Sequence, residues 1–535
     1  MQTLFFDKLQ IPAQADALTL VNNGYLLHGA AVKLHLAEAP RALYRHGWQS
    51  WSLAAWTEPR ELPIQQPAIH HAMQTDPVYT RHPAPHSSGV MALDFGEGKI
   101  LLLGALGLES HLQWRQKTLQ GWYESGPDST WFVAFGPEAQ VFSGYAKLLG
   151  GKFGTGRVKT PYRVWCSWYS LYTAIDEKIL SRIFDELGDL PFDVLQVDDG
   201  WQMAVGDWQA NPKFPSGMAD LAEKIRASGR KAGLWLAPLI AVPSSRLFRE
   251  HPDWFLKTSE GDFAPAGFNW GEPLRALDTT HPAALEWLAG LMKQVRAWGY
   301  DYVKLDFLYA GGLPGQRHSD LPREAAYRQG LSVLREALGE AYLLTCGAPI
   351  LASLGLCDGM RVSTDVSGEW ENFRDAMLWQ NPTTGGARNA LRTTVHRLWL
   401  APLVHPDPDV AYFRHAESKL RPQQNQLLQD MAHICNFKAT SDLPQWLTAS
   451  EKETLRHFLE ETPQMEQTGR YTFRLDGHAV DFSSAAGLPP APGGLTRLQA
   501  ALFNLVSNQP FAMRRAFFRW QKSLAEMRQN LGEGI

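Results

Sequence analysis

The sequence contains little cysteine, no excess of one charge and no long apolar run. Its 535 residues include four cysteines, and no two of these are spaced as C-x-x-C. This scarcity argues against a zinc site and, at this chain length, against a framework of disulfides. The formal net charge is −4 and charged residues make up 20% of the chain. Nucleic acid and anionic membrane surfaces are therefore not expected as partners.

Neither a membrane span nor a secretory signal is indicated. The apolar stretch at residues 100–106 is much too short to cross a bilayer. Residues 1–7 lack the basic segment followed by an apolar segment that is typical of a signal peptide. We therefore expect a soluble, cytoplasmic enzyme with reduced cysteines, either a monomer or a homo-oligomer.

Tryptophan, in contrast, is abundant, with 20 residues in the chain. Flat indole faces stack on the apolar faces of sugars, although indoles are also ordinary core material. Trp48 and Trp51 lie close together among small polar residues, which is typical of an exposed loop. We expect one of the two to pack in a core and Trp48 to reach the functional pocket, with Trp51 as the next candidate.

Residues 1–155 have the pattern of an all-β domain. Apolar and polar residues alternate at residues 31–36, and short apolar runs follow at 100–103 and 131–135. Turns rich in glycine and proline separate them, which predicts an N-terminal β-sandwich. The glycine-rich residues 150–156 are interpreted as a linker to the next domain.

From about residue 160 a strand, polar residues, an amphipathic helix and a glycine recur in that order. Strands are predicted at residues 162–168, 193–197, 231–236, 302–306, 342–345 and 360–363. The seventh strand cannot be identified, and residues 400–404 are a candidate for the eighth. This alternation predicts a (β/α)8 TIM-type barrel over residues 156–440. An open doubly wound sheet is the alternative, made less favourable because no G-x-G-x-x-G motif follows the first strand.

Residues 441–535 are predicted to form a small antiparallel β domain with a polar tail. Ser450 and Glu453 have the spacing of a capping box, which predicts a short helix. Alternating residues on both sides of Asp476-Gly477 predict a β-hairpin. A further strand is expected at residues 500–505.

In a barrel, the residues that end the parallel strands converge on one pocket. These strand ends carry Cys166, Trp168, Asp198, Asp199, Trp235, Lys304, Asp306, Cys346, Arg361 and Asp365. The set contains no histidine and includes two cations, so it is poorly suited to a metal. Carboxylates for hydroxyl binding and catalysis, together with indole faces, suit a sugar. We therefore expect a carbohydrate-active site without metal or cofactor.

Asp306 and Asp365 come from separate strands and could flank a scissile bond. Lys304 beside Asp306 would keep that carboxylate anionic, as a nucleophile requires. A general acid at Asp365 must hold a proton, which a contact with Arg361 would oppose. Arg361 is therefore expected to bind substrate or to serve the structure, and the adjacent Asp198 and Asp199 are expected to bind hydroxyls.

Together these segments resemble glycoside hydrolase family 36, the α-galactosidases. The motifs are GWQSW at 47–51, WCSWY at 165–169, VDDGWQ at 197–202, GDW at 206–208, GLWLAP at 233–238, KLDF at 304–307, CGAP at 346–349 and RVSTD at 361–365. The resemblance implies a retaining enzyme that releases terminal α-linked galactose from small oligosaccharides such as melibiose or raffinose. Asp306 would be the nucleophile and Asp365 the acid/base.

The resemblance also implies the remaining roles. Asp198 and Asp199 would bind the 4- and 6-hydroxyls, and Lys304 the hydroxyls near position 3 or 4. The pocket walls would come from Trp48, Trp235, Cys166, Cys346 and Arg361. Three alternatives stay open: a galactosyltransferase of the raffinose-synthase type, an α-N-acetylgalactosaminidase, and a carbohydrate-binding relic without catalysis.

Overall fold

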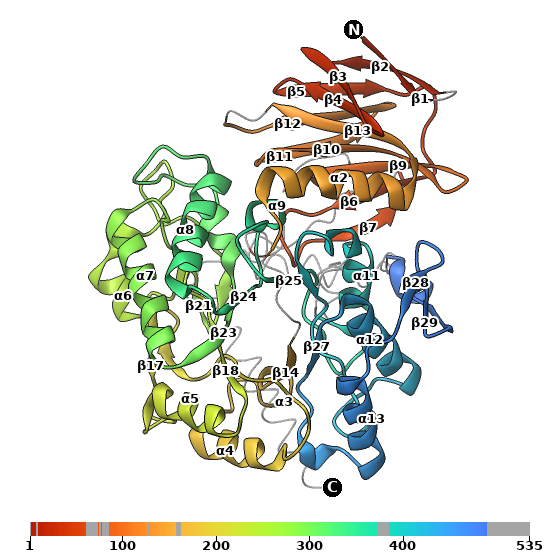
Figure 1. The fold of residues 1–535 in the computed structure, drawn as a ribbon. Coiled ribbons are helices and arrows are strands. Elements are labelled where there is room, and N and C mark those ends of the chain that lie inside the picture. Colours follow the sequence, from red (N-terminus) through yellow and green to blue (C-terminus); the bar gives the residue numbers. More distant parts are fainter. Residues whose placement is uncertain are drawn as a thin grey trace, which may run out of the picture.

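The structure is a computed structural model in which three groups of elements follow one another along the chain (Figure 1). It describes residues 2–6, 9–59, 73, 76, 85–126, 129–156, 162–371 and 385–488. Among the helices in these ranges, none combines the length and the apolar character that a bilayer crossing requires.

The first group is a sandwich of two antiparallel sheets. One sheet has the order β1 (Gln2–Phe6), β2 (Leu9–Gln14), β5 (Ala31–His35), β12 (Thr118–Tyr123), β11 (Ser110–Arg115) and β8 (His86–Ser88). The other has the order β3 (Ala17–Val21), β4 (Gly24–His28), β13 (Thr130–Pro137), β10 (Lys99–Ala105), β9 (Val90–Gly96), β6 (Ala42–His46) and β7 (Ala54–Thr57). The predicted β-sandwich is thus present in the structure.

The central strand β10 of the second sheet is buried on both faces. On strand β10, Leu101 and Leu103 belong to the core between the two sheets. Ile100 and Leu102 point the other way, into the large core that continues into the following domain. A strand covered on both faces needs apolar residues at consecutive positions, which explains the uninterrupted run in the sequence.

Helix α2 (Glu138–Phe153) covers the outer face of this sheet and lies between the sandwich and the next domain (Figure 1). The helix continues through Gly150 and Gly151, so the predicted linker is wrong for residues 150–153. Buried Phe142, Tyr145 and Leu149 anchor the helix, and this packing outweighs the low helix propensity of glycine. The helix ends only at Gly154, which has a φ of 85°.

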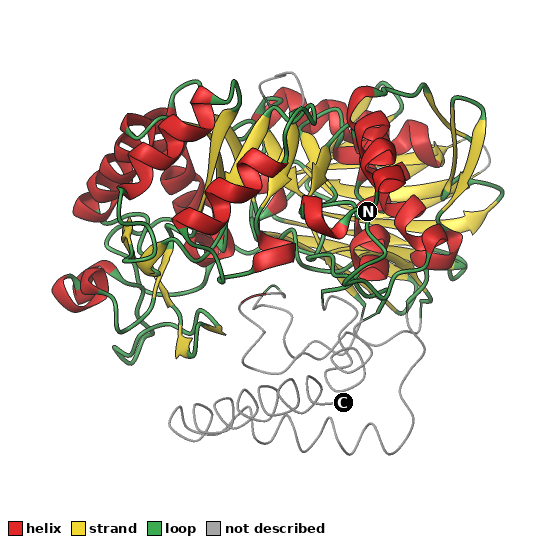
Figure 2. Cartoon of the chain, turned by 90° about the horizontal axis from the view of Figure 1, so that it is seen from below, coloured by secondary structure: helices red, strands yellow, loops and turns green. Residues whose placement is uncertain are grey.

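The second group is a parallel sheet of eight strands with helices outside it (Figures 1 and 2). In chain order its strands are β14 (Arg163–Cys166), β15 (Val194–Val197), β18 (Lys231–Leu236), β23 (Tyr300–Leu305), β24 (Tyr342–Thr345), β25 (Gly359–Arg361), β26 (His405–Asp407) and β27 (Lys438–Thr440). Each strand pairs with its neighbour in the chain from β14 to β26, and β27 pairs with β14. Within the described ranges, no ladder joins β26 to β27.

The helices of this group alternate with the strands. They are α3 (Trp168–Leu171), α4 (Glu177–Glu186), α5 (Gly217–Ala227), α6 (Arg246–Glu250), α7 (Pro282–Ala297), α8 (Arg323–Leu338), α9 (Ile350–Ser353), α11 (Ala387–Val395) and α12 (Pro422–Cys435). Short hairpins extend the loops after β15 and β18, namely β16 (Gln202–Ala204) with β17 (Asp207–Ala210), and β20 (Phe268–Asn269) with β21 (Glu272–Pro273).

Six of the predicted strands agree with the structure to within two residues, and the candidate eighth strand is wrong. Leu400 is the last residue of the 3-10 helix η4 (Leu398–Leu400), and residues 401–404 form a turn and a bend. The seventh and eighth strands are β26 and β27, each only three residues long. Their sequences, HPD and KAT, contain no apolar run, so periodicity could not reveal them.

The third group consists of helix α13 (Ala449–Glu460), a small antiparallel sheet of β28 (Met465–Gln467), β29 (Thr472–Leu475) and β30 (His478–Asp481), and the short helix α14 (Ser483–Ala486). The capping box is formed by Thr448 and Glu451, two residues before the predicted pair. The predicted hairpin turn at Asp476 and Gly477 is confirmed, and both have positive φ. The strand expected at 500–505 and the tail lie outside the described residues.

Candidate active site

A cavity of about 330 Å³ lies where the parallel strands end. Its walls are Trp51, Met73, Trp168, Thr173, Asp198, Asp199, Trp235, Asn269, Trp270, Lys304, Asp306, Phe307, Thr364, Asp365 and Gly385. Seven residues that were predicted at strand ends are therefore brought together: the four aspartates, Trp168, Trp235 and Lys304. The cavity combines acidic side chains with four indole rings, which suits a polar ligand that also has an apolar face.

The sandwich contributes Trp51 to this cavity, and the prediction for Trp48 requires correction. Trp48 is buried, and its Nε1 donates to Glu324 Oε1 at 2.7 Å. Trp51 instead lines the cavity and packs edge-to-face on Phe307, with ring centroids 5.1 Å apart. The spacing in the sequence located the loop correctly but could not distinguish the two indoles.

Arg397 fixes this loop on the parallel sheet. Its Nη1 donates to the carbonyl oxygens of Ser50 at 2.6 Å and of Val362 at 2.9 Å. Its Nη2 donates to the carbonyls of Gly47, Gln49 and Ser52 at 3.0–3.3 Å. One buried guanidinium thus joins the sandwich loop to the end of strand β25, close to Asp365.

Asp198 is the most completely hydrogen-bonded carboxylate of the cavity. Its Oδ2 accepts from Lys304 Nζ at 3.0 Å and from Gln196 Nε2 at 2.7 Å, and its Oδ1 accepts from the Asp199 amide at 2.9 Å. Lys304 therefore pairs directly with Asp198, although Asp306 is its closer neighbour in sequence. Both carboxylates raise the pKa of Lys304, against the effect of its burial, so this side chain stays charged.

Asp199 points to a different wall of the cavity. Its Oδ1 accepts from Gln202 Nε2 at 2.5 Å and its Oδ2 from Trp270 Nε1 at 2.8 Å. Burial raises the pKa of its carboxyl, although these two donors act against the shift. Trp270 was not predicted, because it lies in the long excursion between β18 and β23 where no periodic pattern marks a strand end.

Asp306 follows strand β23 directly and is held by neutral donors. Trp235 Nε1 donates to its Oδ2 at 3.0 Å, and the amide of Phe307 donates to its Oδ1 at 2.8 Å. Phe307 has a left-handed φ of 54°, which is uncommon for a bulky residue. This turn directs the Phe307 amide back onto the carboxylate, so the local backbone itself orients Asp306.

Asp365 occupies a different environment in the same cavity. Its side chain is 47% exposed because it faces the cavity, and Arg361 Nη1 donates to its Oδ1 at 3.1 Å. The pKa of Asp365 is raised, first by desolvation and also by Asp306, whereas Arg361 and Lys304 oppose the rise. The carboxyl is therefore protonated more readily than an ordinary aspartate.

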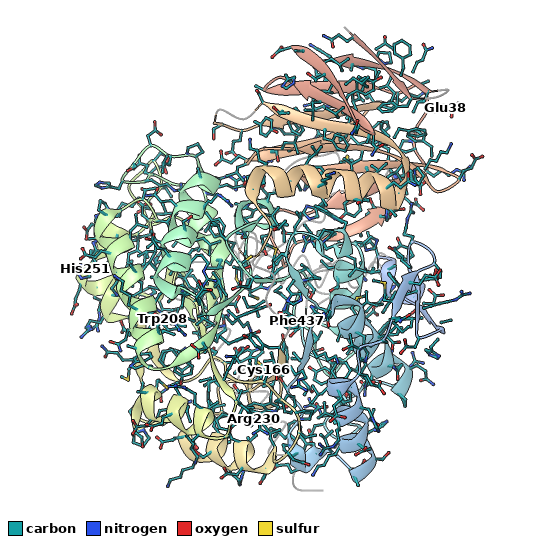
Figure 3. All side chains as sticks on the ribbon, in the orientation of Figure 1. Glu38, Cys166, Trp208, Arg230, His251 and Phe437 are labelled. Carbon is teal, nitrogen blue, oxygen red and sulfur yellow. The ribbon has the colours of Figure 1, made fainter. Side chains whose placement is uncertain are left out.

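Arg361, Cys166 and Cys346 were predicted to line the pocket, and the structure places all three behind its surface. Arg361 is buried and contacts Asp365 itself, the contact that the sequence argument had set aside. Cys166, labelled in Figure 3, ends strand β14 and lies with its Sγ 3.6 Å from Asp198 Oδ2. Burial raises the pKa of both thiols, so they remain neutral.

The arrangement can perform acid–base and nucleophilic chemistry on a polyol. Two carboxyl groups, Asp306 and Asp365, face one cavity in contrasting surroundings, and such pairs divide into an anion and an acid. Within the described part of the chain, no three His, Cys, Asp or Glu side chains are grouped so that they could hold a metal.

The Melibiase family model matches residues 155–341, which contain Asp198, Asp199, Lys304 and Asp306. α-Galactosidase 1 from Pediococcus pentosaceus is 27% identical over 191 residues, which cover 33% of this chain and 25% of that protein. AgaA from Geobacillus stearothermophilus is 27% identical over 184 residues. The matched part of the chain thus spans about a quarter of the length of these curated relatives.

Solved structures extend the similarity to nearly the whole chain. TtGalA, an α-galactosidase from Thermus thermophilus determined with p-nitrophenyl α-D-galactopyranoside, is 45% identical with a TM-score of 0.86, covering 90% of this chain and 99% of that one. The same protein was also determined with stachyose. A family 36 α-galactosidase from Geobacillus stearothermophilus, at 15% identity and a TM-score of 0.55 over 85% of this chain, shares the fold.

Proposed function

The chain belongs to the α-galactosidases of the glycoside hydrolase family 36 type, and from this premise we propose that it hydrolyses terminal α-linked galactose with retention of configuration. The substrates are small oligosaccharides of the raffinose kind. The observation that carries the proposal is the pairing of Asp306 and Asp365 across one cavity with opposite surroundings.

In the first step Asp306 attacks the anomeric carbon and Asp365 gives its proton to the departing glycosidic oxygen. The product is a β-linked galactosyl ester of Asp306 and a free aglycone. In the second step Asp365, now anionic, removes a proton from water, which attacks the same carbon and releases α-galactose. Such a mechanism requires carboxyl groups about 5–5.5 Å apart, and we predict this shorter class of spacing for Asp306 and Asp365, with some widening for an α-linked sugar.

The remaining residues of the cavity bind the sugar. Asp198, Asp199 and Lys304 accept and donate hydrogen bonds to the ring hydroxyls, and Trp235 orients Asp306 while covering one face of the ring. Trp51 takes the wall position that was predicted for Trp48. Cys166, Cys346 and Arg361 act from behind the surface rather than on the substrate.

The same proposal includes the finer architecture. The eight parallel strands close into a (β/α)8 barrel over residues 156–440, and residues 1–155 and 441–535 form the flanking domains. The barrel order of the strands and the ladder between β27 and β14 support closure.

A panel of α- and β-nitrophenyl glycosides tests the function. We expect release of nitrophenol from the α-galactoside, and NMR of the first product should show α-galactose before mutarotation. Initial β-galactose would exclude a retaining mechanism. Release of nitrophenol from the α-N-acetylgalactosaminide alone would indicate an α-N-acetylgalactosaminidase. Transfer of galactose to added sucrose without hydrolysis in water would indicate a galactosyltransferase.

A further inference from the structure

A cluster of buried charges lies behind Asp365. The guanidinium of Arg361 uses three different nitrogens on three carboxylates: Nη1 on Asp365 at 3.1 Å, Nε on Asp407 at 3.0 Å and Nη2 on Asp409 at 2.8 Å. Arg361, Asp407 and Asp409 are each at least 97% buried. Of the three carboxylates, only Asp365 is exposed to the cavity.

This contact creates a difficulty for the acid. A cation that touches a carboxyl group favours its anionic form, whereas a general acid must keep its proton until the bond breaks. Two further carboxylates on the same guanidinium resolve the difficulty. Burial raises the pKa of Asp409 to about 7, so above neutral pH Asp407 and Asp409 together carry more negative charge than Arg361 carries positive charge. In that range little net attraction remains for the anion of Asp365.

We propose that Asp407 and Asp409 are positioning residues for the acid/base: they hold the guanidinium of Arg361 in place and compensate its charge, so that Arg361 orients the Asp365 carboxyl without removing its proton. The inference rests on the proposed function of Asp365. Neither residue touches the cavity, and both act through Arg361.

The backbone around Asp409 is built for this contact. Asp409 has a positive φ of 83°, and its amide donates to Asp407 Oδ1 at 2.7 Å. The amides of Val366 and Val410 donate to its two carboxylate oxygens, both at 2.8 Å. A non-glycine residue held in a costly conformation by several hydrogen bonds indicates a functional constraint.

Tyr169 adds a second effect of the same sign. Its hydroxyl donates its single proton to Asp409 Oδ2 and also lies beside Asp365. With its proton directed to Asp409, Tyr169 lowers the pKa of Asp365 less than Arg361 or Lys304 does. Loss of the Asp409 charge would free the hydroxyl to turn toward Asp365, which would again favour the anionic form.

The tyrosines, cysteines and lysine around Asp365 and Asp409 keep their charge states near neutral pH. Asp365 is faced by Lys304, Asp306, Tyr169, Tyr172 and Cys346, and Asp409 by Tyr412 and Cys166. Burial raises the pKa of each of these tyrosines and cysteines, and the pKa of Lys304 is raised by its carboxylate neighbours. A change of the pH profile near neutrality therefore reports the carboxyl groups.

The test is the pH dependence of kcat/KM for Asp409→Asn with raffinose. We expect the basic limb of the profile to move to lower pH by roughly one unit, because the uncompensated guanidinium favours the anion of Asp365. Activity toward an aryl galactoside with a good leaving group should fall much less, since its departure needs no proton. Asp407→Asn should shift the basic limb in the same direction. This variant replaces Asp409→Asn in the test if Asp409→Asn does not fold.

Asp358→Asn is the matched control. Asp358 precedes strand β25, at the opposite end from Arg361, and is a buried partner of Arg335 at 2.9 Å. Its substitution should lower thermal stability and leave the basic limb in place. The inference is wrong if the folded Asp409 and Asp407 variants keep the wild-type limb, or lose equal activity on both substrates. If wild-type protein itself fails to release α-galactose, the proposed function fails instead.

Discussion

Asp306 and Asp365 belong to two regions of the cavity that hold a carboxyl group in different ways. Around Asp306, at the end of β23, the donors are an indole N–H and a backbone N–H, both neutral and both fixed in direction. Around Asp365, beyond β25, the donor is a guanidinium that two other carboxylates share. The Asp306 carboxylate is thus held by neutral donors, whereas the Asp365 carboxyl is held by a cation whose charge two other carboxylates compensate.

The difference shows how one fold can assign two roles to identical side chains. A nucleophile has to be an anion at a fixed position, and neutral donors provide position without changing the charge. An acid/base has to change its charge during the reaction, and a compensated cation provides position while it tolerates both states. The two regions should therefore respond differently to substitution.

The largest effect should come from Asp306→Ala, because no covalent intermediate can form without this carboxylate. We expect kcat to fall by at least about 10⁴-fold for every galactoside, whatever its leaving group. Added azide should restore turnover by attacking from the vacated face, which gives the β-galactosyl azide. Chromatography and NMR of the product identify the anomer.

Asp365→Ala should give a graded loss instead. We expect roughly 10²- to 10⁴-fold lower kcat/KM for raffinose and a much smaller loss for an activated aryl galactoside, because only the poor leaving group needs a proton. Azide should then yield the α-galactosyl azide from the intact intermediate. If the anomers of the two azide products are exchanged, the roles of Asp306 and Asp365 are reversed.

A smaller effect is expected from the sandwich side of the cavity. Trp51→Ala removes an indole face from the wall and should lower kcat/KM for raffinose by about tenfold. Trp48→Ala should affect the melting temperature more than kcat/KM, because Trp48 is buried against Glu324. A larger loss of kcat/KM for Trp48→Ala than for Trp51→Ala would restore the original prediction for Trp48.

The smallest effect concerns stability and pH. Since the pKa of Asp365 is raised in the folded protein, the native state binds more protons than the unfolded state above the ordinary aspartate pKa. Stability contributed by this group is thus lost as the pH rises toward its folded pKa. Asp365→Asn stays neutral, so its melting temperature should exceed that of wild type by a few degrees at pH 8 and by less at pH 4. Calorimetry at both pH values measures the difference, and a variant less stable at pH 8 would contradict it.

Strong strands made the Asp306 region predictable from the sequence. Asp198, Asp199 and Asp306 directly follow apolar strands, so the alternation of strands and helices placed them at one end of a parallel sheet. The region around Asp365 could be predicted from the sequence only in part. Asp407 and Asp409 belong to or follow a three-residue strand whose sequence carries no apolar signal, and the burial that reveals their role exists only in three dimensions.

Contacts between distant segments were equally hidden. Nothing in the sequence distinguishes Trp48 from Trp51 as the wall residue, because the choice depends on how the loop docks on η3 (Leu308–Gly312) and Phe307. Arg361 was correctly recognised as a problem for the acid, but its resolution requires two carboxylates 46 and 48 residues away.

The docking of the sandwich loop through Arg397 has a consequence for synthesis of the chain. Ser52 precedes Arg397 by 345 residues, which takes a ribosome roughly 20–70 s at 5–20 residues per second. During that interval the carbonyl groups of Gly47, Gln49, Ser50 and Ser52 lack the guanidinium that binds them in the folded chain, and the parallel sheet beside Trp51 is incomplete. The active site is therefore completed late in translation, when a residue from the last third of the chain reaches back to one from its first tenth.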